Sequence, residues 1–110
     1  MKNTWIFGLP GNPVSTYISF MMTVVPLIER LLGSDELKRP ILSGKFSGTF
    51  KKRGNRMDFV PCRVKDNIIE QIKYNGSGDF TSLARANAFF VIHPGVNVLK
   101  DGDSVNYLMI

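Results

Sequence analysis

The sequence predicts an α+β chain made of two unlike parts, a strand–turn–helix segment followed by a small C-terminal β-barrel domain. Two observations lead to this fold class. Between residues 14 and 32, apolar side chains recur every three or four positions, which is the spacing of one face of an α-helix. From residue 41 onward, short apolar runs alternate with turn-forming residues, which is typical of a small sandwich or barrel.

The division into parts follows from a change in composition after Gly33. Residues 1–33 form the first part, the charged and polar residues 34–40 a linker, and residues 41–110 the β domain. A single strand and a single helix cannot complete an α/β layer. We therefore expect the first part to be the C-terminal piece of a larger α/β domain.

The first part is predicted in order along the chain. Residues 4–7 are rich in β-formers and suggest a buried strand, followed by a tight turn with two glycines and two prolines at residues 8–13. Asn12 is a good helix N-cap, and Pro13 suits the first helical position. Pro26 should kink the helix, and Gly33 is placed to end it.

Residues 3–28 carry no charge, so a membrane span has to be considered. Glycines, prolines and polar residues interrupt the first half of this stretch. The apolar remainder is short and contains Ser19, Thr23 and Pro26. We expect a buried strand and helix here, and no membrane span.

The second part is predicted as short strands joined by turns. Strands are expected at residues 44–50, 56–64, 68–74, 88–92 and 104–110, with turns at 52–55, 65–67, 94–95 and 101–102. A flexible loop is expected at 75–78, before a short helical segment that starts at Asp79 or Thr81. Asn87 suits a left-handed exit from that segment. Cys62 is expected to be a core residue.

The composition limits the classes of function. The chain has 110 residues, of which 44% are hydrophobic and 21% charged, as in one modest folded domain. A net charge of +5 favours an anionic partner, such as a nucleotide, a phosphate, an oxyanion or nucleic acid. The basic cluster at residues 51–56 is interpreted as a solvated hairpin tip. Cys62 is the one cysteine, which excludes an intrachain disulfide and fits a cytoplasmic location.

The most informative segment is the turn and helix start at residues 8–15, with the sequence GLPGNPVS. Backbone amides at a helix N-terminus bind anions. Because prolines have no amide hydrogen, the donors that remain belong to Gly11, Asn12, Val14 and Ser15. These amides would form a pocket for a small oxyanion or a phosphate. The alternative interpretation is an ordinary capped helix without a ligand.

The string GLPGNPVS is similar to the signature of the MoeA and gephyrin E-domain family. Further segments match that family in order along the chain, namely residues 54–59, the Gly-Ser-Gly loop 76–78, the SLARAN segment 82–87 and the closing hairpin 99–105. The resemblance implies the tail of a MoaB/MogA-like α/β domain followed by a small β-barrel. It covers nearly the whole chain.

The resemblance implies part of a molybdopterin molybdenumtransferase. Enzymes of this family take adenylated molybdopterin and molybdate, release AMP and leave molybdenum on the dithiolene. They use magnesium and are typically homodimers with the site between subunits. The acidic metal ligands of the family lie upstream of the matching segments. We therefore expect that this chain alone holds no metal or cofactor and is inactive, and its catalytic residues stay unassigned.

The resemblance also assigns binding residues. It implies that five residues of the signature lie at the molybdate pocket, with Ser77 facing the same cleft; the five are Pro10, Gly11, Asn12, Pro13 and Ser15. Arg56 is a further candidate for the anionic substrate. The alternatives are that Ser77 only shapes a glycine turn and that Arg56 is a solvated charge.

One strand position departs from the family pattern. Some members carry an active-site basic residue two places after the equivalent of Phe59, and this chain has Pro61 there. Arg63 or Arg56 is the candidate to take over the role of that basic residue. Arg85 is expected to pair with a carboxylate such as Asp79, and His93 to be an exposed turn residue.

Two other functions remain open beside the enzyme. The first alternative is a scaffold domain that binds peptides, as the gephyrin E domain does beside its barrel. The second is a basic β-barrel module for single-stranded nucleic acid, which would need aromatic side chains on an open face. Five of the phenylalanines in the β part are expected mostly in the core, namely Phe46, Phe50, Phe59, Phe89 and Phe90. Nucleic acid is therefore ranked last as a partner.

Overall fold

The computed structural model describes residues 3–11, 13–35, 40–52, 54–72 and 80–110, without the side chains of Pro13 and Phe80. The chain divides into two compact units. Unit 1 comprises Met1–Leu37 and Asn75–Phe80, and unit 2 comprises Lys38–Tyr74 and Thr81–Ile110. The two units are described separately below.

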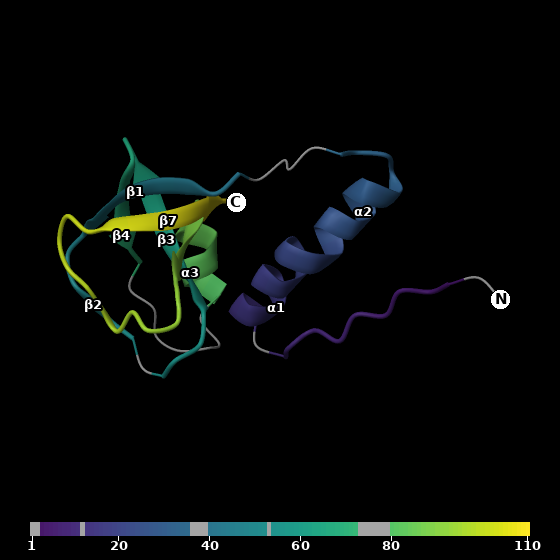
Figure 1. Cartoon of the computed structure of the whole chain (residues 1–110), viewed down its shortest axis with the longest axis horizontal. Helices are drawn as coiled ribbons and strands as arrows, with labels where there is room; N and C mark the ends of the chain where they lie inside the picture. The colour runs from purple at the N-terminus through teal and green to yellow at the C-terminus, as the bar shows by residue number, and fades with distance from the viewer. Residues whose placement is uncertain (1–2, 12, 36–39, 53, 73–79) are drawn as a thin grey trace. The chain divides into compact units, whose positions relative to one another are not determined.

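Unit 1 contains one helical run in three segments (Figure 1). These are α1 (Pro13–Ser19), the π-helical segment η1 (Phe20–Val24) and α2 (Val25–Leu31). The helix starts at Pro13, as predicted. The amide of Val25 donates to the carbonyl of Phe20, five residues earlier, which is the π-helical spacing. Pro26 lacks an amide hydrogen, and its ring crowds the preceding turn of the helix. The helix responds with the local break in α-helical hydrogen bonding at η1, where a kink was expected.

The C-terminus of α2 confirms the role expected for Gly33. Gly33 has a φ of 92°, a conformation that glycine adopts without a Cβ penalty. Its amide donates to Arg30 O at 3.0 Å, and the amide of Ser34 donates to Glu29 O at 2.9 Å. This pair of bonds is the Schellman motif, which satisfies the carbonyl groups left over at a helix end.

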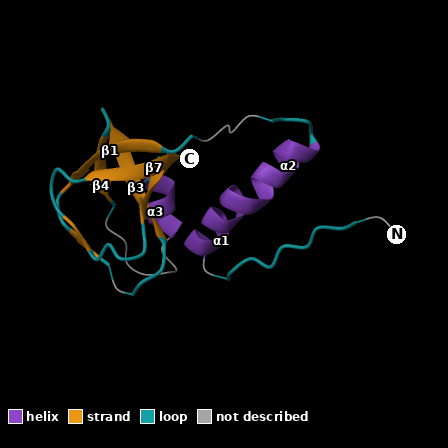
Figure 2. Ribbon diagram, viewed as in Figure 1, coloured by secondary structure: helices purple, strands orange, loops and turns teal. Residues whose placement is uncertain are grey.

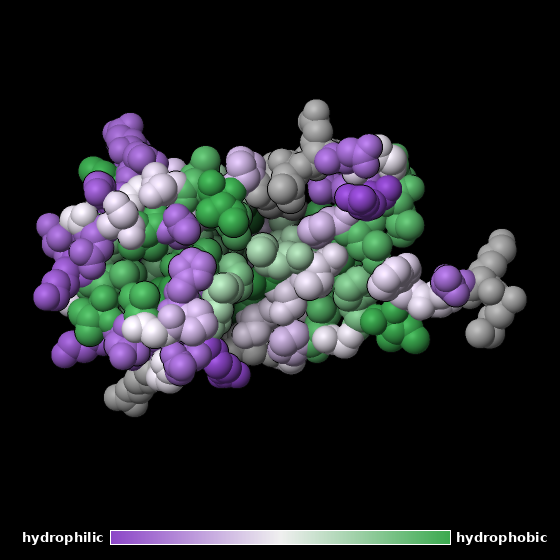
Figure 3. Space-filling model, viewed as in Figure 1, coloured by the Kyte–Doolittle hydropathy of each residue, from purple (hydrophilic) through white to green (hydrophobic). Residues whose placement is uncertain are grey.

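The predicted strand at residues 4–7 does not form. Residues 3–10 have no regular secondary structure, and Trp5 and Ile6 are 68% and 89% exposed. A strand requires a hydrogen-bonded neighbour, and no described strand pairs with this segment. The helix is less buried than expected as well, since Val14 is the only buried residue among those described in unit 1. Hydrophobic atoms are accordingly visible on the surface in Figure 3.

Within the described residues, one helical stretch, Val14–Leu31, is long and apolar enough to cross a membrane. That criterion concerns length and composition only, and core helices of water-soluble proteins meet it too. The expectation of no membrane span therefore stays a prediction.

Unit 2 is a closed β-barrel with a small additional sheet (Figure 2). The barrel order is β1-β4-β3-β5-β7, and its strands are β1 (Leu42–Ser47), β3 (Asp58–Lys65), β4 (Ile68–Gln71), β5 (Ala88–Ile92) and β7 (Ser104–Met109). Neighbouring barrel strands are antiparallel except β1 and β4, which are parallel. β2 (Phe50–Lys51) and β6 (Val98–Leu99) form the second, two-stranded sheet.

The predicted strands are confirmed in position, with changes at their ends. The stretch expected at 44–50 is interrupted at Gly48, whose φ is 94°, so β1 ends at Ser47 and β2 begins at Phe50. The strand expected from residue 56 begins at Asp58, and β4 ends at Gln71. β6 was not predicted, because two residues are too short to show an alternating pattern.

The barrel core consists of side chains that alternate inward along the strands. Phe46, Cys62, Ile69 and Phe90 are at most 1% exposed, and all five residues of β5 are buried. The ring of Phe90 packs edge-on against Phe46 and Phe50, with centroid distances of 5.3 and 5.4 Å. Cys62 is in the core, as predicted. These phenylalanines contribute to the barrel core, as predicted for most phenylalanines of the β part.

The turn between β3 and β4 uses two residues in the left-handed region. Asp66 and Asn67 have φ values of 52° and 64°, as in a type I′ hairpin turn. A Cβ added to Gly44 would lie only 2.6 Å from the carbonyl oxygen of Asn67. The hydroxyl of Tyr107 donates to Asn67 Oδ1 at 2.8 Å. Glycine at position 44 therefore permits the close approach of β1 to this turn.

The helical segment before β5 forms, but its exit differs from the prediction. α3 spans Phe80–Arg85, whereas Asn87 does not have a positive φ. The side chain of Asn87 instead pairs with the backbone of Val64: its Oδ1 accepts from Val64 N at 2.7 Å, and its Nδ2 donates to Val64 O at 2.9 Å. The prediction that Asn87 leaves the helix in a left-handed conformation was wrong. The conformation of Asn87 is determined by its side-chain contact with β3, and not by the termination of α3.

The expected solvated hairpin tip at residues 51–56 also needs correction. Lys51 and Arg56 are exposed, but Lys52 is only 8% exposed. Side chains alternate along β2, so Lys52 follows Phe50 to the inner face while Lys51 faces solvent.

Candidate functional site

The turn and helix start at residues 8–15 are the first candidate site. Gly11 is exposed, and a Cβ built on it meets no atom within 4 Å, so a ligand can approach its backbone closely. Val14 is buried and Ser15 is half-buried at the start of α1. Asn12, the expected N-cap, lies outside the described residues, and only the backbone of Pro13 is described.

The structure adds one residue that the sequence did not single out. The hydroxyl of Thr16 donates to the carbonyl of Pro10. This bond connects the chain before the helix to the first turns of α1. The signal in the sequence was weak, because a threonine in the first turn of a helix more often bonds to a neighbouring turn of its own helix.

The remaining candidates lie elsewhere in the chain. Arg56 belongs to unit 2 and is exposed in the bend before β3. Ser77 lies outside the described residues. The structure therefore describes Pro10, Gly11 and Ser15 in one unit and Arg56 in the other, and a common pocket for these residues stays a prediction.

Position 61 has no basic side chain to offer. Pro61 is buried in β3 opposite Phe89 of β5. Arg63, two residues further on, donates from its guanidinium to the carbonyl of Arg85 at 2.7 Å, which joins β3 to the end of α3. This contact gives Arg63 a structural role. The partner expected for Arg85, Asp79, lies outside the described residues, and Arg85 Nε is 3.4 Å from the carbonyl of Thr81.

Cys62 is not a candidate nucleophile. It is fully buried, and desolvation raises the pKa of its thiol from 9.0 to about 12, against a smaller lowering by a backbone hydrogen bond to Phe90. Because the thiolate is the reactive form, a buried thiol with a raised pKa is inert.

This property gives a testable result. At pH 8, we expect iodoacetamide to label native Cys62 at least about 100-fold more slowly than the chain in denaturant. Because the folded chain raises the pKa of the thiol, the folded state holds its proton more tightly than the unfolded state. The stability that results is fully present below pH 9, the pKa of the unfolded chain, and is lost as the pH rises towards 12. Mass spectrometry of the labelled chain measures the rate. Equal rates for the native and denatured chains would contradict the core position of Cys62.

No group of three or more His, Cys, Asp or Glu residues suited to a metal ion occurs in the described part of the chain. The described acidic residues near the barrel end are engaged by the backbone. Asp101 Oδ1 accepts from Gly48 N, and Asp103 Oδ2 accepts from Lys100 N, each at 2.8 Å.

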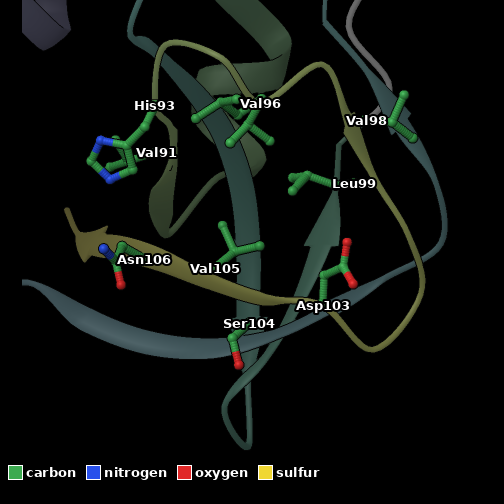
Figure 4. A pocket seen from close by; sticks show the side chains of 10 residues that line it. Val91, His93, Val96, Val98, Leu99, Asp103, Ser104, Val105 and Asn106 are labelled. Atoms are coloured by element: carbon green, nitrogen blue, oxygen red, sulfur yellow. The ribbon is translucent and has the colours of Figure 1, made fainter.

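A second candidate is a pocket of about 330 Å³ on the barrel (Figure 4). Leu99 and Val105 point into its middle, and polar side chains lie around them. The pocket is lined by β5, β6, β7 and their connections, with the residues Val91, Ile92, His93, Val96, Val98, Leu99, Asp103, Ser104, Val105 and Asn106. An apolar floor with a few polar groups at its rim suits an apolar side chain or a small amphipathic ligand. His93 is exposed, as predicted.

Comparison with known proteins identifies the barrel unit. The family model described as "MoeA C-terminal region (domain IV)" matches residues 43–110. A solved structure of the MoeA protein from Pyrococcus horikoshii OT3 superposes with a TM-score of 0.79 at 22% identity, over 91% of this chain and 26% of that chain. A second MoeA structure from Pyrococcus horikoshii has a TM-score of 0.75 at 31% identity, over 93% of this chain and 25% of that chain.

Similar proteins of named function are longer. A molybdopterin molybdenumtransferase from Haemophilus influenzae is 31% identical over 96% of this chain and 28% of its own length. A gephyrin from Dictyostelium discoideum is 30% identical over 97% of this chain and 17% of its own length. The chain thus spans less than a third of the length of either relative. Since the family model covers residues 43–110, well over half of the chain, the chain belongs to the family of MoeA C-terminal regions, and its barrel is a MoeA domain IV.

Proposed function

We propose that this chain is the C-terminal part of a molybdopterin molybdenumtransferase and acts in molybdenum cofactor biosynthesis. The observation that carries the proposal is the tied turn at the start of α1, in which Thr16 holds the carbonyl of Pro10 beside the open backbone of Gly11. This turn precedes a barrel of the MoeA domain IV family in the same chain. The function named for the Haemophilus relative supports the same assignment.

In the proposed reaction, molybdate and adenylated molybdopterin are the substrates and AMP is released. The role of the turn is to present main-chain amides to molybdate. Fixed amides stabilise negative charge without reorganising, and they do so best where water is excluded. Ser15 lies in the first turn of α1, and its hydroxyl is assigned as a further donor to the oxyanion.

Magnesium belongs to this chemistry in the whole enzyme. The described residues do not suit it, because no cluster of acidic side chains occurs among them. We assign this chain no part in holding the metal, and no step of the reaction is derived through it. A homodimer with the site between subunits and a cytoplasmic location complete the proposal.

A chimeric enzyme tests this function. The C-terminal region of the Haemophilus influenzae relative that aligns with this chain is replaced by the chain itself. We expect molybdate-dependent release of AMP from adenylated molybdopterin. In the chimera, Gly11→Val should reduce that activity by about 100-fold, because the added side chain covers the amides that stabilise the oxyanion.

The matched control is Ser47→Val, which adds the same side chain at an exposed barrel position. Its activity should stay near that of the unmodified chimera. A chimera that is folded by circular dichroism but releases no AMP would contradict the proposal. Equal activity of the Gly11→Val and Ser47→Val chimeras would remove the turn from the site.

A second candidate function is a gephyrin-like scaffold that binds a short peptide. The observation that favours it is the barrel pocket, which has room for an apolar side chain over Leu99 and Val105. The similarity to the Dictyostelium gephyrin supports this reading as well. The two candidates are separated by the chimera: peptide binding by a chain whose chimera releases no AMP favours the scaffold.

A further inference from the structure

The ammonium group of Lys52 is buried and has no hydrogen-bond partner among the residues that the structure describes. Lys52 is 8% exposed, and its Nζ is the buried side-chain atom without a hydrogen-bond partner in the described part of the chain. Lysine normally buries its methylene stem and keeps its charged head in water. Lys52 does the reverse, and a desolvated charge without a partner is strongly unfavourable.

The local backbone explains why the side chain turns inward. The amide of Lys52 donates to the carbonyl of Asn97 at 2.8 Å, which continues the pairing of β2 with β6 by one residue. Strand alternation then places Lys52 on the same side as Phe50, whose ring packs on Phe90 in the core. In Figure 1, β2 lies at the lower left of the barrel.

The neighbouring sequence offers no carboxylate to balance this charge. Residues 41–57 contain no acidic residue and five basic ones, namely Lys45, Lys51, Lys52, Arg53 and Arg56. Asp101 and Asp103 accept hydrogen bonds from the backbone amides of Gly48 and Lys100. None of the described residues pairs with the ammonium group of Lys52, and the excess positive charge of the segment attracts an anion.

We propose that Lys52 binds a phosphate group of a nucleotide-containing substrate beside the end of β2. This inference rests on the proposed function, and adds to it a barrel residue for the phosphate of the adenylated substrate. A lysine ammonium binds phosphate as a compact point charge with three donors. The four-carbon stem lets the ammonium move towards an anion while the backbone stays paired with β6.

The test compares Lys52→Met with Lys51→Met in the complete 110-residue chain. Both variants lose one positive charge, but Lys51 is exposed and Lys52 is buried. Thermal unfolding is followed while AMP or inorganic phosphate is added at constant ionic strength. A ligand that binds only the folded chain raises Tm with its concentration. We expect AMP to raise Tm in the wild type and in Lys51→Met, and its affinity to fall about tenfold or more in Lys52→Met.

Lys52→Gln serves as a second variant if Lys52→Met does not fold, and it should lose the AMP response as well. The same AMP response in wild type and in the Lys52 variants, or no response in any of them, would overturn the proposal. A Lys52-dependent response to inorganic phosphate without one to AMP would overturn the assignment to a nucleotide. Because these titrations contain no molybdate and measure no AMP release, their failure is distinguishable from failure of the proposed function.

Discussion

Replacing Phe90 by alanine is expected to destabilise unit 2 by about 3–5 kcal/mol. Phe90 is fully buried, and its ring contacts Phe46 and Phe50 edge-on at centroid distances of 5.3 and 5.4 Å. The loss combines the transfer free energy of the ring, the cavity that remains, and the edge-to-face contacts with two neighbours. Small domains have a total stability of about 5–15 kcal/mol, so this variant should lose a large share of the stability of the barrel.

Urea unfolding followed by circular dichroism measures this change in free energy. The control is Phe20→Ala, since Phe20 is 40% exposed in η1 and removing its ring leaves no enclosed cavity. The control should cost much less than Phe90→Ala. If the two variants unfold at the same urea concentration, Phe90 is not the centre of the barrel core.

Replacing Asn87 by alanine is expected to cost about 2–4 kcal/mol, because two partly buried backbone groups of Val64 lose their partner. Asn87 also joins other strands through its own backbone. Its amide donates to Cys62 O at 3.0 Å, and its carbonyl accepts from Ile110 N at 2.9 Å. The side-chain amide of Asn87 thus pairs with the backbone of β3 in the way that a neighbouring strand would, at the point where α3 leads into β5.

An aspartate at this position provides a more demanding test. Asn87→Asp keeps the shape and the acceptor for Val64 N, but it places a carboxylate oxygen against Val64 O. We expect it to be at least as destabilising as Asn87→Ala. Asn97→Ala is the control, because Asn97 is exposed and contributes a backbone carbonyl to Lys52. Amide hydrogen exchange at Val64 reports the loss directly, and unchanged protection in Asn87→Ala would contradict this role.

The candidate site was predictable from the sequence to a limited extent. The sequence proposes the amides near Gly11 from the glycines, the prolines and the helix start at Pro13, which are all local features, and their role in binding stays a prediction. The tie from Thr16 to Pro10 was not visible, because a side chain can bond to several nearby carbonyls and only the coordinates select one. The burial of Lys52 was missed for a similar reason, since a basic run usually indicates a solvated surface.

The sequence by itself determined the helix from Pro13 to its end before Gly33, the approximate strand positions of the β part and the family of the chain. These features depend on residues within a few positions of one another, where spacing and turn chemistry act directly. Only the tertiary structure decided the closure of the barrel, with β1 between β4 and β7, and the absence of a strand at residues 4–7. Strand pairing joins residues that are far apart along the chain. The alternation of apolar residues can therefore indicate a strand, but it does not show which other strand pairs with it.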